Sequence, residues 1–261
     1  MRDPSGMEVA VLIAGVADPK WPLPAQVTPE ALRAHGERYA VPSPFDESAL
    51  ELALKLRDAD PAVRVTALVA AGEPLARKVA GWRPDALHRL DLEAVPRWDG
   101  GATGAALAGA LRGLAPESAL VLVGREFGDL DDGTVPAALA HGAGLAQVGL
   151  ALALERRAEG LWALRQAAGG LERVRLPAPA LLAVSNDPGN RLRHPLMKNV
   201  MAAKTARIGL WRAEAADPCA ALEGVKPASE PPRRAACEWI EGSAAEKARA
   251  LARVLMEAGR A

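Results

Sequence analysis

The sequence predicts an α/β fold: a doubly wound, mostly parallel sheet with antiparallel hairpins and a C-terminal arm that ends in a helix. Apolar runs at residues 8–16 and 119–123 are continuous rather than alternating, which is typical of strands buried on both faces. Segments with helical periodicity separate these runs, as in parallel sheets with crossover helices. After Ala140 the apolar runs shorten, and turn residues such as Gly160 lie between them, which predicts hairpins.

The first strand, at 8–16, is followed by a proline-rich loop and then by a clear helix start. Ser43 suits the N-cap, Pro44 the first helical position and Asp46 the first turn. Phe45, Ala49, Leu52 and Leu56 recur at helical spacing and form one apolar stripe. The elements predicted next are a strand at 63–70, a helix through 75 and 79, a strand at 87–92, a helix at 103–114, the strand at 119–123 and a helix at 136–140.

The second half predicts short antiparallel strands at 150–155, 161–165 and 171–176, and a buried strand at 179–184. Residues 218–232 hold four prolines and few large apolar side chains, so we expect an extended arm there. Ser243 and Glu246 form a capping-box pattern that opens a helix to Gly259. We therefore expect an α/β domain at 1–211 and a C-terminal arm with its helix at 212–261.

Charge and composition exclude several classes of function. The chain has 261 residues, with 32 Lys plus Arg against 32 Asp plus Glu, and this balance argues against a nucleic-acid binder. No apolar run approaches the ~20 residues of a membrane span, so we expect no membrane insertion. The two cysteines, Cys219 and Cys237, form no disulfide framework or zinc ribbon, and a reducing cytoplasm is the default compartment.

The loop from Gly124 to Val135 is the one segment whose residues suggest ligand chemistry. It follows a buried strand and precedes a helix, where backbone N–H groups can bind a phosphate. Taken alone, the aspartates of this loop are more typical of a solvated acidic turn than of a binding site. A metal site is a weaker alternative. The four histidines are scattered, and neither Gly-x-Gly-x-x-Gly nor a Walker lysine motif is present. The residues alone therefore predict an α/β protein without a defined chemistry.

Six segments, in order, resemble the beta subunit of the electron transfer flavoprotein family. They are Val-Ala-Asp-Pro at 16–19, Ser-Pro-Phe-Asp-Glu-Ser-Ala-Leu at 43–50, the loop and helix at 124–139, Gly-Gly-Leu-Glu at 169–172 with Leu-Pro-Ala-Pro-Ala at 176–180, Asn-Arg-Leu-Arg at 190–193 with Asn-Val-Met-Ala-Ala-Lys at 199–204, and Pro-Pro-Arg-Arg-Ala-Ala at 231–236. The resemblance covers nearly the whole chain and implies an adenine-nucleotide-binding type of α/β fold.

The resemblance also implies a function. In that family the beta subunit pairs with an alpha subunit that holds a redox FAD, and the pair carries electrons from a flavin dehydrogenase toward a quinone reductase. The beta subunit catalyses no bond chemistry and buries an AMP without a redox role; its C-terminal arm embraces the alpha subunit. The matching AMP positions are Leu12, Ser43, Ala71, Gly124, Asp129, Asp131, Asp132, Gly133, Thr134 and Val135, and Phe45 matches a residue near the flavin. Matching positions of the segment that docks dehydrogenases are Asn190, Arg191, Arg193, Met197 as the apolar anchor, and Lys204.

The sequence departs from the family pattern at several of these positions. Ala14 replaces a lysine, Ser43 an asparagine and Asp132 a threonine, and Asp132 adds charge where a phosphate is expected. Two other functions stay open: a stand-alone adenine-nucleotide-binding protein, and a bifurcating form with a second FAD in place of AMP. Phe45 could instead staple its helix, and Met197 could lie in the core.

Overall fold

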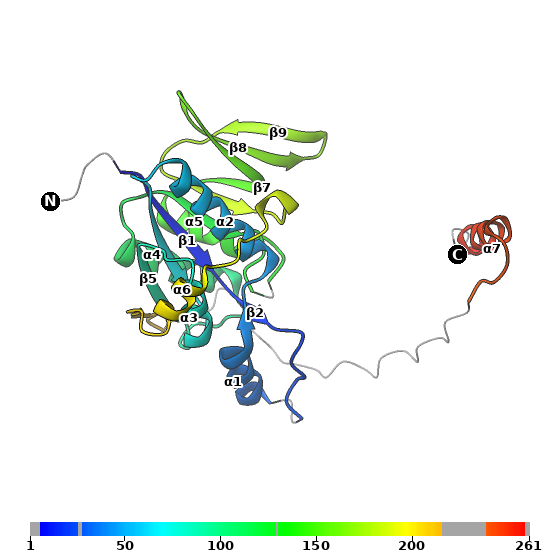
Figure 1. The fold of residues 1–261 in the computed structure, drawn as a ribbon, viewed down its shortest axis with the longest axis horizontal. Coiled ribbons are helices and arrows are strands. Elements are labelled where there is room, and N and C mark those ends of the chain that lie inside the picture. Colours follow the sequence, from blue (N-terminus) through cyan, green and yellow to red (C-terminus); the bar gives the residue numbers. More distant parts are fainter. Residues whose placement is uncertain (1–5, 26–27, 129, 216–238, 259–261) are drawn as a thin grey trace. The chain divides into compact units, whose positions relative to one another are not determined.

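The computed structural model describes residues 6–25, 28–128, 130–215 and 239–258. Within these residues nine strands form one sheet, and those from β11 to β7 run parallel (Figure 1). β7, β8 and β9 pair antiparallel. This confirms the predicted fold class. In spatial order the strands are β11 (Gly209–Arg212), β5 (Ala86–Asp91), β4 (Arg64–Val69), β1 (Glu8–Ile13), β6 (Ser118–Gly124), β10 (Ala180–Val184), β7 (Ala146–Arg157), β8 (Gly160–Ala167) and β9 (Gly170–Arg175).

Helices cover both faces of the parallel part of the sheet. α2 (Pro44–Ala59) and α3 (Glu73–Ala80) pack on one face, and α4 (Gly100–Leu114) and α5 (Thr134–Ala143) on the other. The side chains of β1 alternate between these layers: Val9, Val11 and Ile13 belong to the first core, and Ala10 and Leu12 to the second. Burial on both faces explains why this strand is apolar from Val9 to Ile13.

β1 is shorter than the predicted strand, because the backbone turns away from the sheet at Gly15. Gly15 has a φ of +69°, a left-handed conformation that favours glycine. A Cβ at this position would lie 2.6 Å from Cδ2 of Leu75. The chain then forms β2 (Val16–Ala17), which pairs antiparallel with β3 (Ala40–Val41).

Besides β2 and β3, the sequence prediction lacks α1 (Pro29–Tyr39), the 3₁₀ turn η1 (Pro188–Asn190), α6 (Met197–Ala203) and β11. α1 begins with a Thr28 side chain that accepts a hydrogen bond from the Ala31 N–H. The predicted docking segment at 190–204 therefore contains a short helix, α6, after an irregular stretch at 191–196. The seven residues of α6 have no side-chain N-cap, so no capping pattern marks them in the sequence.

The chain divides into two compact units, Met1–Ala221 and Leu222–Ala261. In the second unit, α7 (Ala244–Ala258) begins at the predicted capping box. The Ser243 N–H donates to Glu246 Oε2 over 2.8 Å, and the Glu246 N–H donates to Ser243 Oγ over 3.4 Å. The predicted arm at 218–232 and both cysteines lie outside the described residues, and the predicted boundary at residue 211 stays a prediction. Every helix in the described part is too short or too polar to cross a bilayer.

Candidate functional site

Parallel register brings the candidate nucleotide residues to one edge of the sheet, at the carboxyl ends of the strands. β1 pairs with β4 and β6, so the backbone after Leu12, the turn at Ala71 and the loop from Gly124 leave the sheet on the same side. Open α/β sheets bind ligands at this edge. Leu12 is fully buried and Ala71 is half-buried, and both belong to the hydrophobic packing beneath the edge.

Asp46 organises this edge, a role that the sequence analysis missed. Its carboxylate accepts hydrogen bonds from the N–H groups of Ala14 at 3.0 Å, Gly15 at 3.0 Å and Ser43 at 2.9 Å. The Asp46 N–H in turn donates to Ser43 Oγ, so the capping box of α2 is complete. Burial raises the pKa of Asp46, while its backbone donors oppose that rise. Asp46 thus joins the start of α2 to the end of β1.

Phe45 and Arg125 face each other at the same edge. The Arg125 guanidinium lies over the Phe45 ring, 5.1 Å from its centroid, a cation–π contact. Its Nη2 is 2.9 Å from a Glu126 carboxylate oxygen and 3.4 Å from one of Asp131. Gly124 permits this approach, since a Cβ there would lie 2.8 Å from Phe45 Cβ. Phe45 therefore does more than staple its helix: it supports a cation at the strand ends.

One backbone N–H at the start of α5, that of Thr134, is already hydrogen-bonded within the protein. Asp132 accepts a hydrogen bond from the Thr134 N–H over 2.8 Å, and this bond lowers the pKa of Asp132. Gly133 is the N-cap, with a φ of +72° and open space around it. Pro136 has no N–H, and Val135 is buried. Asp129 lies outside the described residues.

An AMP phosphate fits this edge in one respect and conflicts with it in another. Arg125 Nε is buried and has no hydrogen-bond partner in the described part of the chain, so this guanidinium, although paired with Glu126 and Asp131, has an unused donor at the strand ends. The space beside Gly133 is also open. The carboxylates of Asp131 and Asp132 are exposed near the same loop and repel an anion. Arg125 and the open space beside Gly133 are thus the features of this edge that suit a phosphate, and Asp131 and Asp132 are those that oppose it.

Metal chemistry gains no support from the described residues. Among residues 6–25, 28–128, 130–215 and 239–258, no three His, Cys, Asp or Glu side chains come together as a metal site.

The candidate docking segment is held by two of its own predicted contact residues. Asn190 is 3% exposed, donates to the Leu152 carbonyl, and accepts a hydrogen bond from Lys55 Nζ at 3.0 Å. Arg193 pairs with Glu51 at 2.7 Å and with Asp58, which raises the pKa of Arg193 further above its ordinary value. Arg193 is therefore not a free cation beside Met197, because two carboxylates pair with it.

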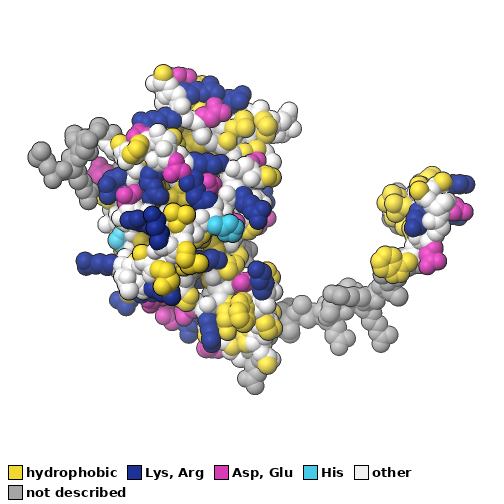
Figure 2. Space-filling view, viewed as in Figure 1, with side chains coloured by type: hydrophobic (Ala, Val, Ile, Leu, Met, Phe, Trp, Pro, Cys, Tyr) yellow, Lys and Arg dark blue, Asp and Glu magenta, His cyan; other side chains and the backbone are white. Residues whose placement is uncertain are grey.

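The other docking positions are accessible. Met197 is 75% exposed at the start of α6, which rules out the alternative that it lies in the core. Leu196 and Met201 beside it are also exposed, as are Arg191 and Lys204. Figure 2 shows yellow hydrophobic patches with dark blue Lys and Arg side chains among them over the region where Figure 1 places α6. The docking role of these residues stays a prediction.

Comparison with known proteins decides the family. Residues 34–216, more than half of the chain, match the electron transfer flavoprotein domain. The chain belongs to the electron transfer flavoprotein domain family. It is also 29% identical over 219 residues to the electron transfer flavoprotein subunit beta of Syntrophomonas wolfei subsp. wolfei, an alignment that covers 77% of this chain and 84% of that protein. The resemblance inferred from the motifs is thus confirmed.

The region that matches the electron transfer flavoprotein domain contains both candidate sites except Leu12. It includes the start of α2, the loop from Gly124 to Val135 and the segment 190–204.

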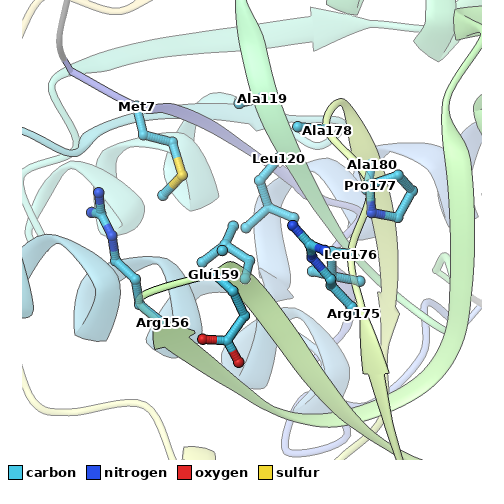
Figure 3. Close-up of a pocket in the computed structure, with 12 residues that line it drawn as sticks. Met7, Ala119, Leu120, Arg156, Glu159, Arg175, Leu176, Pro177, Ala178 and Ala180 are labelled. Atoms are coloured by element: carbon cyan, nitrogen blue, oxygen red, sulfur yellow. The ribbon is translucent and has the colours of Figure 1, made fainter.

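A separate cavity of about 630 Å³ lies at the opposite end of the sheet, beside Met7, Leu120 and Ala180 at the amino ends of the strands. Arg156 and Arg175 lie on opposite sides of this cavity (Figure 3), and Arg156 pairs with Asp60. Nucleotides bind such sheets at the carboxyl ends of the strands, so this cavity is distinct from the candidate nucleotide site.

Proposed function

We propose that this chain is the beta-type subunit of an electron transfer flavoprotein. It forms a heterodimer with an alpha subunit that holds FAD, and the heterodimer carries electrons from a flavin dehydrogenase toward a quinone reductase. The observation that supports this most is the family match over residues 34–216, since it spans the carboxyl edge and the docking segment together. FAD supplies the electron-carrying chemistry when the alpha subunit binds it.

In this proposal the residues of this chain hold a nucleotide and bind the partner proteins, and they take no part in a chemical reaction. Asp46 fixes the corner between β1 and α2, and Phe45 supports Arg125 at the strand ends. Arg125 and the backbone around Gly133 would bind the phosphate of AMP, a structural nucleotide in this proposal. Met197 would enter an apolar pocket of the dehydrogenase, with Arg191 and Lys204 favouring an acidic rim.

The C-terminal region, 212–261 in our division, would pack on the alpha subunit. Leu251, Val254 and Leu255 recur at helical spacing on α7, and each is more than half exposed. An apolar stripe of this kind needs a covering surface, because exposed apolar area marks interaction sites. The alpha subunit is the partner that the family assignment offers.

Co-expression tests the proposal. The chain expressed alone should be colourless, and expressed with an alpha-type subunit it should co-purify as a yellow heterodimer. Leu255→Asp on α7 should lower the yield of heterodimer, while Arg249→Gln on the same helix should not. A chain that remains a monodisperse monomer in the presence of alpha-type subunits would refute the proposal.

A further inference from the structure

A second cavity, of about 600 Å³, lies between α3 and the segment 191–204. One wall comes from Pro74 and Lys78 of α3 and from Trp82, and the other from Leu192, Val200 and Ala203. Its size is within the range of about 300–1,000 Å³ that is usual for small-molecule sites. None of the residues assigned above to the nucleotide edge lines this cavity.

The walls of the cavity are fixed before any ligand arrives. The Trp82 Nε1–H donates to the Arg193 carbonyl over 2.6 Å, and Arg193 is itself held by Glu51 and Asp58. Arg77 donates to the Lys204 carbonyl over 2.9 Å, and this bond joins α3 to the end of α6. Arg77 also pairs with Glu73 of the same helix. When a cavity is preformed, little of the binding free energy is lost to ordering its side chains.

The charges around the cavity are unbalanced. Of its five lysines and arginines, Arg77 and Arg193 have carboxylate partners. Lys78, Arg191 and Lys204 are exposed and form no ion pair with any residue that the structure describes. Glu47 is the one carboxylate among the lining residues, so at least two positive charges have no counter-charge. The surrounding sequence agrees, because residues 188–213 contain six lysines and arginines and no acidic residue, in a chain of zero net charge.

We propose that this cavity binds an organic anion. A flat or extended apolar body would lie against Trp82 and Leu192, and a phosphate or carboxylate would lie among Lys78, Arg191 and Lys204. Apolar walls with a few convergent polar groups are typical of sites for small molecules, and the polar groups here are all cations except Glu47 and His194. The inference rests on the cavity and its charges, and it shares Arg191 and Lys204 with the docking role in the proposed function.

Calorimetric titration of the full-length protein with three probes tests the site. The probes are 1-naphthyl phosphate, decanoate and inorganic phosphate. We expect one molecule of 1-naphthyl phosphate to bind with a Kd below about 1 mM, and inorganic phosphate to bind at least about tenfold more weakly, because it buries no apolar surface. Tighter binding of decanoate than of 1-naphthyl phosphate would also support the site and would indicate an acyl rather than an aromatic ligand. Equal binding of all three probes, or no saturable binding of either organic anion, would overturn the proposal.

Variants locate the bound anion. Lys78→Gln combined with Lys204→Gln should weaken binding about tenfold, since each exposed ion pair contributes up to about 1 kcal/mol. Lys198→Gln is the matched control: Lys198 lies on α6 but does not line the cavity, so the change in Kd should stay below about twofold. Val200→Trp would fill the cavity and abolish binding while leaving every charge in place. Binding that survives Val200→Trp, or that responds equally to Lys198→Gln, would place the anion elsewhere and overturn the proposal.

Discussion

Asp46→Asn tests whether this carboxylate holds the carboxyl edge together. In the wild type, three backbone N–H groups donate to Asp46 at 2.9 to 3.0 Å, and Asp46 is 1% exposed. A hydrogen bond to a charged group contributes about 1.5–3 kcal/mol, and a buried donor left without a partner costs about 1–3 kcal/mol. Asparagine keeps one acceptor oxygen, so at least one of the three donors would face an NH₂ group instead. We expect a loss of about 3 kcal/mol, which lowers the Tm by roughly 6–12 °C for a unit of this size.

Thermal unfolding followed by circular dichroism measures the effect, and the adjacent residue provides the control. Glu47→Gln makes the same chemical change on a half-buried side chain and should cost about 0.5 kcal/mol or less. Ser43→Ala, which removes the other half of the capping box, should cost about 1 kcal/mol. If Asp46→Asn melts within about 2 °C of the wild type, Asp46 does not organise the edge.

The pH dependence of the same variant has a defined sign. Because burial raises the pKa of Asp46 above its ordinary 3.8, the folded state binds this proton more readily than the unfolded state. The proton-linked part of the free energy of unfolding is therefore fully present below pH 3.8 and falls as the pH rises through the folded-state pKa. The hydrogen bonds that the carboxylate accepts at neutral pH are a separate contribution. Asp46→Asn should lack this fall in the free energy of unfolding, and an unchanged pH profile would contradict the assignment.

Three further substitutions separate docking, folding and nucleotide binding. Met197→Ala should slow electron transfer from the dehydrogenase about tenfold, as a loss of ~1.4 kcal/mol implies, and leave the Tm unchanged because Met197 is 75% exposed; a lowered Tm with intact transfer would contradict docking. Arg193→Ala should cost about 2 kcal/mol in denaturant unfolding, since the buried Glu51 carboxylate loses its guanidinium partner and keeps only the backbone N–H of residue 193; unchanged stability with a salt-dependent loss of association would show that Arg193 acts in docking instead. Asp132→Thr should raise the affinity for AMP about threefold in calorimetry by removing one like charge, and a weaker affinity would show that Asp132 supports the site.

The parallel core could be predicted from the sequence because the burial of each strand is visible in the strand's own residues. β1, β4 and β6 are apolar on both faces, and Ser43-Pro44 and Ser243 mark helix starts through their own capping bonds. α1 carries the same kind of signal, Thr28 followed by Pro29 and Glu30, and could have been found by the rule that located α2.

The site contacts could not be predicted, because they join residues that are distant in the chain. Asp46 meets Ala14 across 32 positions, and Arg193 meets Glu51 across 142. Neither pair has a sequence spacing that implies contact, and the same side chains look like an ordinary first-turn acid and an exposed cation. α6 was missed for a different reason: it is short, lacks a side-chain cap and is stabilised by contacts with α3.

The most direct test of the central claim is the cofactor content of the purified heterodimer. Denatured complex should release one FAD and one AMP per pair of subunits, which chromatography with absorbance detection measures against protein concentration. Two FAD and no AMP would instead indicate the bifurcating form. A heterodimer that releases no flavin would contradict the assignment of this chain as a subunit of an electron transfer flavoprotein.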